Sequence, residues 1–294
     1  MALITLAADK GAPGVTTAAL ALASVWPNPV LLAECDPSGG DLMFRFPAPD
    51  GHRLDQRRGL LSLAVAGRRD YQQQQIWQHA QKIHGGLDVL VGVTNAEQGA
   101  GLGSLWGPLG KMLAAMPEAD AIADCGRIGP DGHAYDLLAA ADTVVLVTRP
   151  NLADIVRLRD RAAAVATAME RRGRRGFMLD VLVVADPQQL KDAQAEVAHA
   201  VAQAGVPLRR TSGLARDQKG AGLLSGAWGG KLDRTLLMRT AREVAGELCS
   251  VFPGGTTPPG TPPSRGTRPV PPDPPGPPVP VPPGPSLTYR VEGG

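Results

Sequence analysis

The chain has 294 residues, of which 43% are hydrophobic and 20% charged, and its formal net charge at pH 7 is +2. This composition predicts one sizeable core. The small net charge gives no sign of the strongly basic surface that nucleic-acid-binding proteins carry. The three widely spaced cysteines make no disulfide framework, and no apolar run approaches the roughly 18 residues of a membrane span, so we expect a soluble cytoplasmic protein without a transmembrane segment.

Residues 1–252 alternate short apolar runs with helical patterns. The apolar runs predict strands at residues 3–8, 30–34, 87–91, 119–124, 143–148 and 178–185. Helical spacing of apolar residues predicts helices at 15–25, 54–66, 71–83, 101–116, 131–140, 152–171, 188–204 and 231–250. This alternation predicts a three-layer α/β fold, with a mostly parallel sheet flanked by helices on both faces. Because the first strand begins at residue 3, we expect no signal peptide.

The composition changes sharply near residue 252. From residue 253 onward Pro, Gly, Ser and Thr dominate, and more than half of the 28 prolines lie there. Proline removes amide donors and fixes φ, which excludes regular helix and sheet. We therefore predict a folded domain over 1–252 and a disordered proline-rich tail over 253–294. The tail serves either as a spacer or as a ligand for an aromatic groove of a partner.

Residues 9–17 read Asp-Lys-Gly-Ala-Pro-Gly-Val-Thr-Thr and lie between a predicted strand and a predicted helix, which is the layout of a phosphate-binding P-loop. Gly11 and Gly14 let the backbone turn tightly, so that successive N–H groups can surround an anion. Thr16 occupies the hydroxyl position that holds Mg²⁺. Val15 stands where a P-loop has its lysine. A plain strand-to-helix turn could also use Gly-x-Pro-Gly.

Acidic residues follow two further predicted strands. Glu34 and Asp36 come at the end of the strand 30–34, and Asp124 ends the strand 119–124. A carboxylate at the end of an apolar strand is the Walker-B arrangement, in which Asp contacts the shell of Mg²⁺. Each segment alone is also compatible with a helix cap or an acidic turn. Three such segments at three parallel strand ends together predict a nucleotide site.

The combination resembles the ParA/MinD group of deviant-Walker P-loop ATPases, over about residues 1–250. Lys10 matches the first lysine of their loop, which in that family reaches the nucleotide of the partner subunit in a sandwich dimer. Ala12 replaces the second glycine and Pro13 the variable position. Val15 replaces the second lysine, and Thr16 matches the Ser/Thr.

The resemblance extends beyond the loop. Glu34 and Asp36 match the two acids after the second strand of the family, and Asp36 stands where a carboxylate helps to orient the attacking water. Asp124 matches the Walker-B carboxylate. Residues 213–217 resemble a worn Ile-Pro-x-Asp stretch, which implies that Asp217 lies near the adenine pocket, although the proline is missing.

The retained first lysine and the lost second lysine match the TadZ/CpaE-like branch, whose members localise Tad-type pilus assembly to a cell pole. The resemblance implies a prokaryotic cytoplasmic positioning factor, recruited to a pole or a membrane-associated complex. It also implies a homodimer, ATP and Mg²⁺ as cofactors, and a secretion or pilus ATPase or its scaffold as partner. The implied phosphate-binding residues are Lys10, Gly11, Ala12, Pro13, Gly14, Val15, Thr16 and Thr17. The implied magnesium-organising residues are Thr16, Asp36 and Asp124, with Lys10 and Asp36 as the catalytic pair.

Val15 in place of lysine predicts weak or absent hydrolysis. A charge-assisted hydrogen bond contributes about 1.5–3 kcal/mol, so its loss weakens triphosphate binding by roughly 10- to 100-fold unless Lys10 swings in to replace it. Hydrolysis suffers more, because charge grows on the β–γ bridge in the transition state. Two alternatives remain. One is an active ParA-type ATPase that moves on DNA, with the basic residues 171–175 as its contact; a solvated helix end is the favoured interpretation of that cluster. The other is a pseudo-ATPase scaffold that binds no nucleotide.

Overall fold

The computed structural model describes residues 1–10, 13–67, 74–129, 134–227 and 230–252. The chain divides into two units, Met1–Thr257 and Pro258–Gly294. The second unit and the whole of the predicted proline-rich tail lie outside the described residues.

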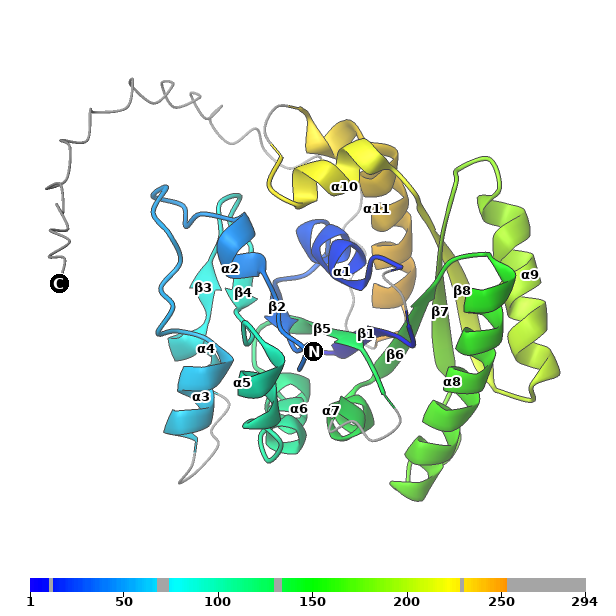
Figure 1. Cartoon of the computed structure of the whole chain (residues 1–294), viewed down its shortest axis with the longest axis horizontal. Helices are drawn as coiled ribbons and strands as arrows, with labels where there is room; N and C mark the ends of the chain where they lie inside the picture. The colour runs from blue at the N-terminus through cyan, green and yellow to red at the C-terminus, as the bar shows by residue number, and fades with distance from the viewer. Residues whose placement is uncertain (11–12, 68–73, 130–133, 228–229, 253–294) are drawn as a thin grey trace, which may run out of the picture. The chain divides into compact units, whose positions relative to one another are not determined.

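The described part of the chain forms one eight-stranded sheet in the order β3-β4-β2-β5-β1-β6-β7-β8 (Figure 1). All neighbouring strands are parallel except β3, which is antiparallel to β4. The strands are β1 Leu3–Ala8, β2 Val30–Glu34, β3 Gln81–Lys82, β4 Asp88–Leu90, β5 Asp120–Arg127, β6 Thr143–Thr148, β7 Leu179–Ala185 and β8 Leu208–Ala215. The predicted α/β fold with a mostly parallel sheet is therefore confirmed.

Two apolar clusters cover the two faces of this sheet. One cluster contains residues of α1, α2, α10 and α11, and the other residues of α3, α4, α6, α7, α8 and α9 (Figure 1). The helices are α1 Val15–Ser24, α2 Leu42–Arg45, α3 Leu60–Ala66, α4 Gln75–His79, α5 Ala96–Ala100, α6 Trp106–Ala114, α7 Ala134–Ala140, α8 Leu152–Arg171, α9 Leu190–Gln203, α10 Gln218–Leu224 and α11 Leu236–Cys249. The three cysteines are free and buried.

Several helices begin later than their apolar periodicity indicates. The helix predicted at 54–66 starts at Leu60, because Ser62 and Gly59 exchange hydrogen bonds that cap it there. Of the helix predicted at 71–83, residues 71–73 lie outside the described ranges, and residues 74–83 contain α4 and then β3 at residues 81–82. The helix predicted at 231–250 is regular from Leu236, where Thr235 accepts a capping hydrogen bond from the N–H of Met238. Where a cap is present, the cap rather than the periodicity sets the start.

Candidate functional site

The order β2-β5-β1 brings the ends of three strands together. Glu34 on β2 and Leu6 on β1 both pair with Asp124 on β5. Leu32, Leu6 and Ile122 pack in the cluster that contains α1. Successive strand side chains alternate between faces, so Glu34 and Asp124, two residues beyond Leu32 and Ile122, lie on the α1 side at the carboxyl edge of the sheet. The segments that the sequence singled out are thus neighbours in space.

The loop between β1 and α1 ends in a left-handed glycine. Gly14 has φ 100° and ψ 37°, is the N-cap of α1, and its carbonyl accepts a 2.8 Å hydrogen bond from the N–H of Ala18. This conformation favours glycine, and it starts the helix so that its first N–H groups face the loop. Gly11 and Ala12 of the predicted phosphate cradle lie outside the described residues.

Val15 is a packing residue. Its side chain is only 7% exposed and belongs to the apolar cluster that α1 forms with α10 and α11. The residue that the sequence predicts at the lysine position of a P-loop therefore contributes to the core, and the following residues, Thr16 and Thr17, are half-buried at the start of α1.

Asp124 is buried, with 2% of its surface exposed. It accepts a 3.0 Å hydrogen bond from the N–H of Gly126, and the hydroxyl of Thr16 lies close enough to lower the pKa of Asp124. Burial nevertheless raises the pKa of Asp124 to about 6, with a further contribution from the negative charges of Glu34 and Asp36. A nearby cation would stabilise the charged form of this carboxylate, because it offsets both the lost solvation and the repulsion by the neighbouring negative charges.

Asp36 lies beside Asp124, beyond the end of β2. Its carboxylate accepts a 2.8 Å hydrogen bond from the N–H of Ser38 and a further one from the backbone of Arg127. Burial raises the pKa of Asp36, although these hydrogen bonds lower it. The carboxylate packs on Gly126, where a Cβ atom would lie 1.7 Å from Oδ2 of Asp36. Asp36 and Asp124 therefore converge on Gly126 from two strands.

Glu34 has a different role from the other two acids. It is 2% exposed, and its two oxygens accept hydrogen bonds from the N–H groups of Asp41, Leu42 and Gly92. Burial is the largest influence on the pKa of Glu34 and raises it, against the lowering effect of these bonds. With both oxygens engaged, Glu34 is a poor candidate for a metal ligand.

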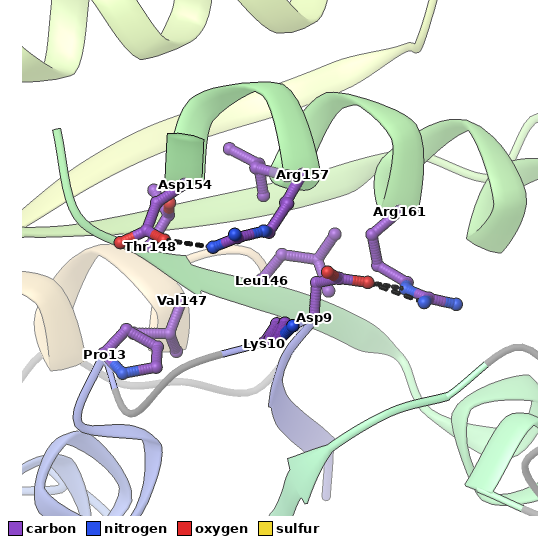
Figure 2. Close-up of a pocket in the computed structure, with 10 residues that line it drawn as sticks. Asp9, Lys10, Pro13, Leu146, Val147, Thr148, Asp154, Arg157 and Arg161 are labelled. Carbon is purple, nitrogen blue, oxygen red and sulfur yellow. Dashed lines mark hydrogen bonds and ion pairs between the residues drawn. The ribbon is translucent and has the colours of Figure 1, made fainter. Parts of the chain in front are cut away.

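Lys10 is exposed next to a small cavity of about 10 Å³ between the loop and α8 (Figure 2). Its neighbour Asp9 points to Arg161 of α8, with 2.6 Å between Oδ1 and Nε, and Arg161 also donates to the hydroxyl of Tyr135 at 3.0 Å. These contacts attach the start of the loop to α7 and α8. No residue of the described ranges pairs with the ammonium of Lys10, which leaves it available to an external anion.

Asp217 lies at the far end of the same sheet edge, after β8. One of its oxygens accepts from the N–H of Gly220, and the other accepts from Leu236 at 2.9 Å and Leu237 at 3.4 Å. Its carboxylate thus connects α10 to α11. It also lines a cavity of about 420 Å³, whose other lining residues are Asp186, Pro187, Arg216, Gln218, Lys219 and Leu236.

The donors at the strand ends fit a magnesium ion only together with a ligand. Among the described residues, no three His, Cys, Asp or Glu side chains gather as a metal site. Mg²⁺ bound to nucleotides takes one or two protein ligands, with phosphates and waters completing its shell. Thr16 and Asp124, whose buried negative charge a cation would stabilise, can supply such a pair of oxygens.

No helix of the described ranges is long and apolar enough to cross a membrane.

No protein-family model matches the chain, and no curated protein matches it. Solved structures do match its fold. A ParA family ATPase from Chlorobium tepidum TLS is 18% identical, with a TM-score of 0.61 over 83% of this chain and 98% of that one. The ATP complex of a substituted McdA from Cyanothece is 17% identical, with a TM-score of 0.61 over 85% and 96%. The MinD cell division protein of Aquifex aeolicus is 16% identical, with a TM-score of 0.59 over 85% and 97%. This chain therefore has the P-loop fold of ParA- and MinD-type ATPases.

Proposed function

We propose that the protein is an ATP- and Mg²⁺-binding positioning factor of the ParA/MinD type, with weak or absent hydrolysis. The observation that carries the proposal is the position of the Thr16 hydroxyl beside the buried carboxylate of Asp124, whose pKa it lowers, directly after the left-handed Gly14. A Ser/Thr hydroxyl and an Asp organise the metal of P-loop proteins, and the fold of this chain is that of such proteins, which supports the proposal.

The residues have separate roles in this proposal. Backbone groups from Gly11 to Thr17 bind the phosphates, and Thr16 and Asp124 hold Mg²⁺, which neutralises charge between the phosphates when bound. Asp36, held next to Asp124, orients the water that attacks. Lys10 is exposed without a described partner and acts on the nucleotide of a second copy in a homodimer. Among the described residues we assign no other cation to the place of Val15, so turnover is slow.

The cavity beside Asp217 is proposed to hold the base. Its volume of about 420 Å³ falls within the range of small-molecule sites, and it lies at the carboxyl edge of the sheet, where ligands of such folds bind. Because the carboxylate of Asp217 already binds three backbone N–H groups, Asp217 shapes this cavity rather than pairing with the base.

The setting of the activity is proposed from the resemblance of the loop to the TadZ/CpaE-like branch. The protein would act in the prokaryotic cytoplasm and be recruited to a pole or a membrane-associated complex, with a pilus or secretion ATPase or its scaffold as partner.

The alternative of a DNA track receives less support. Arg172 pairs with Asp136 at 3.0 Å, and Arg174 donates to carbonyl oxygens of Ala139 and Ala141, so two arginines of the basic cluster are engaged within the fold.

Titration of the full chain with fluorescent ATP and ADP, each with and without Mg²⁺, tests the proposal. We expect saturable binding that Mg²⁺ strengthens, together with a rate of ATP hydrolysis well below one per second. Saturable binding with fast hydrolysis would support an active ATPase instead. Absence of binding at millimolar nucleotide would leave the pseudo-ATPase scaffold, which the packing of Val15 in the core favours as the second candidate.

Restoring a cation at residue 15 should strengthen ATP binding. In Val15→Lys the apolar stem can replace the valine in the core while the ammonium extends toward the loop. A charged hydrogen bond contributes about 1.5–3 kcal/mol, so we expect roughly a tenfold or greater gain in ATP affinity, measured by the same titration. Val15→Met has a similar stem without charge and should bind like the wild type. Equal affinities for the lysine and methionine variants would contradict the assigned cause of weak binding.

A further inference from the structure

The buried side chain of Glu34 connects the loop that follows β2 to the segment that follows the neighbouring strand β4. Oε1 of Glu34 accepts from Asp41 N at 2.8 Å and Leu42 N at 3.1 Å, and Oε2 accepts from Gly92 N at 2.9 Å. Asp41 and Leu42 begin α2, whereas Gly92 follows β4. A single carboxylate therefore connects two segments that lie far apart in the chain.

The backbone around Glu34 is shaped to fit it. A Cβ atom on Gly40 would lie 1.9 Å from Cδ of Glu34, and one on Gly92 would lie 3.0 Å from Cγ. The N–H of Gly40 also donates to the carbonyl of Val93 at 2.7 Å. The segment 36–41 is thus packed on the segment 92–93 so closely that it has room for Glu34 only where side chains are missing.

Asp36 lies at the other end of this fixed loop. Its carboxylate is in contact with Gly126. Gly40, which packs on the carboxylate of Glu34, lies four residues further along the same loop. The side chain of Asp36 receives hydrogen bonds from Ser38 and Arg127, and Ser38 belongs to the same loop. If the loop moved away from β4, Asp36 would lose its contact with Gly126.

We infer that Glu34 is a positioning residue: its carboxylate fixes the loop 36–41 against the end of β4 and thereby holds Asp36 against Gly126. Glu34 acts through the backbone and touches neither phosphate nor metal. The geometric claim concerns the ligand-free protein, whereas its consequence for the site rests on the proposed function.

Coupling between Glu34 and Gly126 is the sharpest test, because it needs no nucleotide. In Glu34→Gln one oxygen becomes an NH₂ group, which faces an N–H and cannot accept its hydrogen bond. In Gly126→Ala the new methyl group collides with Asp36 as long as Asp36 is held in place. We expect Gly126→Ala to lower the melting temperature of the Glu34→Gln protein by about half of its effect in the wild type, because the strain of the left-handed backbone remains when the collision is relieved. Equal drops in both backgrounds would overturn the inference.

Two controls separate positioning from general stability. Gly129→Ala adds a methyl group where no atom of the described residues lies within 4 Å, and its effect should be the same in the wild type and in the Glu34→Gln protein. Hydrogen exchange should become faster at the amides of Ser38, Asp41 and Gly92 in Glu34→Gln, while the amides of the distant β7 stay protected. Uniformly faster exchange, or unchanged exchange at these three amides, would count against the inference.

Measuring the ATP affinity of Glu34→Gln with and without Mg²⁺ connects the loop to the proposed function. If the wild type binds ATP, Glu34→Gln should retain the affinity measured without Mg²⁺ and lose at least about three-quarters of the gain that Mg²⁺ gives. A loss of both affinities in equal proportion would assign Glu34 to the fold alone. If the wild type binds no ATP, the proposed function fails, and the coupling and exchange results still decide whether Glu34 holds Asp36.

Discussion

Replacing Asp124 with asparagine is expected to stabilise the ligand-free protein while removing the effect of Mg²⁺ on ATP binding. Asparagine keeps the shape of the side chain and carries no charge; its oxygen can accept from the N–H of Gly126, and its NH₂ group can donate to the Thr16 hydroxyl, which accepts as well as donates. Burial raises the pKa of Asp124 from 3.8 to about 6. Since one pKa unit corresponds to about 1.4 kcal/mol, the buried charge destabilises the ligand-free protein at neutral pH by at most about 3 kcal/mol.

The sign of this effect gives it a characteristic pH dependence. The stabilisation by the neutral form of Asp124 is fully present below a pH of about 4 and is lost as the pH rises through about 6, since the folded state holds its proton longer than the unfolded state. Urea unfolding between these pH values and pH 8 should show a falling stability for the wild type and a smaller fall for Asp124→Asn. A variant that is less stable than the wild type at pH 8 would contradict the burial argument.

Adding one methyl group at Gly126 is expected to displace Asp36 and to destabilise the fold. Its Cβ would lie 1.7 Å from Oδ2 of Asp36, and its φ of 55° is left-handed, which adds about 1–2 kcal/mol for a residue with a side chain. We expect Gly126→Ala to lower the free energy of unfolding by about 2–4 kcal/mol, in the range of overpacked positions, and to reduce Mg²⁺-dependent ATP binding.

The matched control is Gly85→Ala, at a left-handed glycine with a φ of 94°, where the described part of the chain has no atom within 4 Å of the new methyl group. It measures the backbone effect alone. The new methyl group would meet Oδ2, Cγ and Cβ of Asp36 at 1.7, 2.2 and 2.7 Å, so the excess loss in Gly126→Ala should disappear when Asp36 is replaced by glycine, which lacks all three atoms. An excess that persists in the Asp36→Gly background would show that Asp36 is not held against Gly126.

Much of the fold could be predicted because the spacing of apolar residues distinguishes buried strands from amphipathic helices. The strands β1, β2 and β6 and the helix α8 have the predicted bounds, since their burial patterns are continuous or strictly helical. The edge strand β8 was not among the predicted strands. Its sequence Leu-Arg-Arg-Thr-Ser-Gly-Leu-Ala is polar and half-buried, and only pairing with β7 makes it a strand.

The candidate site was predictable to the extent that topology determines it. Parallel strands place their ends at one edge, which is why Thr16, Asp36 and Asp124 could be brought together from sequence alone. The role of Glu34 could not be predicted, because it depends on N–H groups of Leu42 and Gly92 that only the tertiary fold delivers. The glycines at residues 39, 40 and 92 are the one sequence signal that could have indicated a close approach there.

Calorimetric titration of the full-length wild type with ATP and Mg²⁺, paired with Asp124→Asn, tests the central claim most directly. The account predicts a saturable heat for the wild type that is larger with Mg²⁺ than without it, and a small heat for Asp124→Asn that Mg²⁺ does not change. No heat from the wild type at millimolar ATP and Mg²⁺, or an equal response to Mg²⁺ in both proteins, would contradict a nucleotide-magnesium site at Thr16 and Asp124.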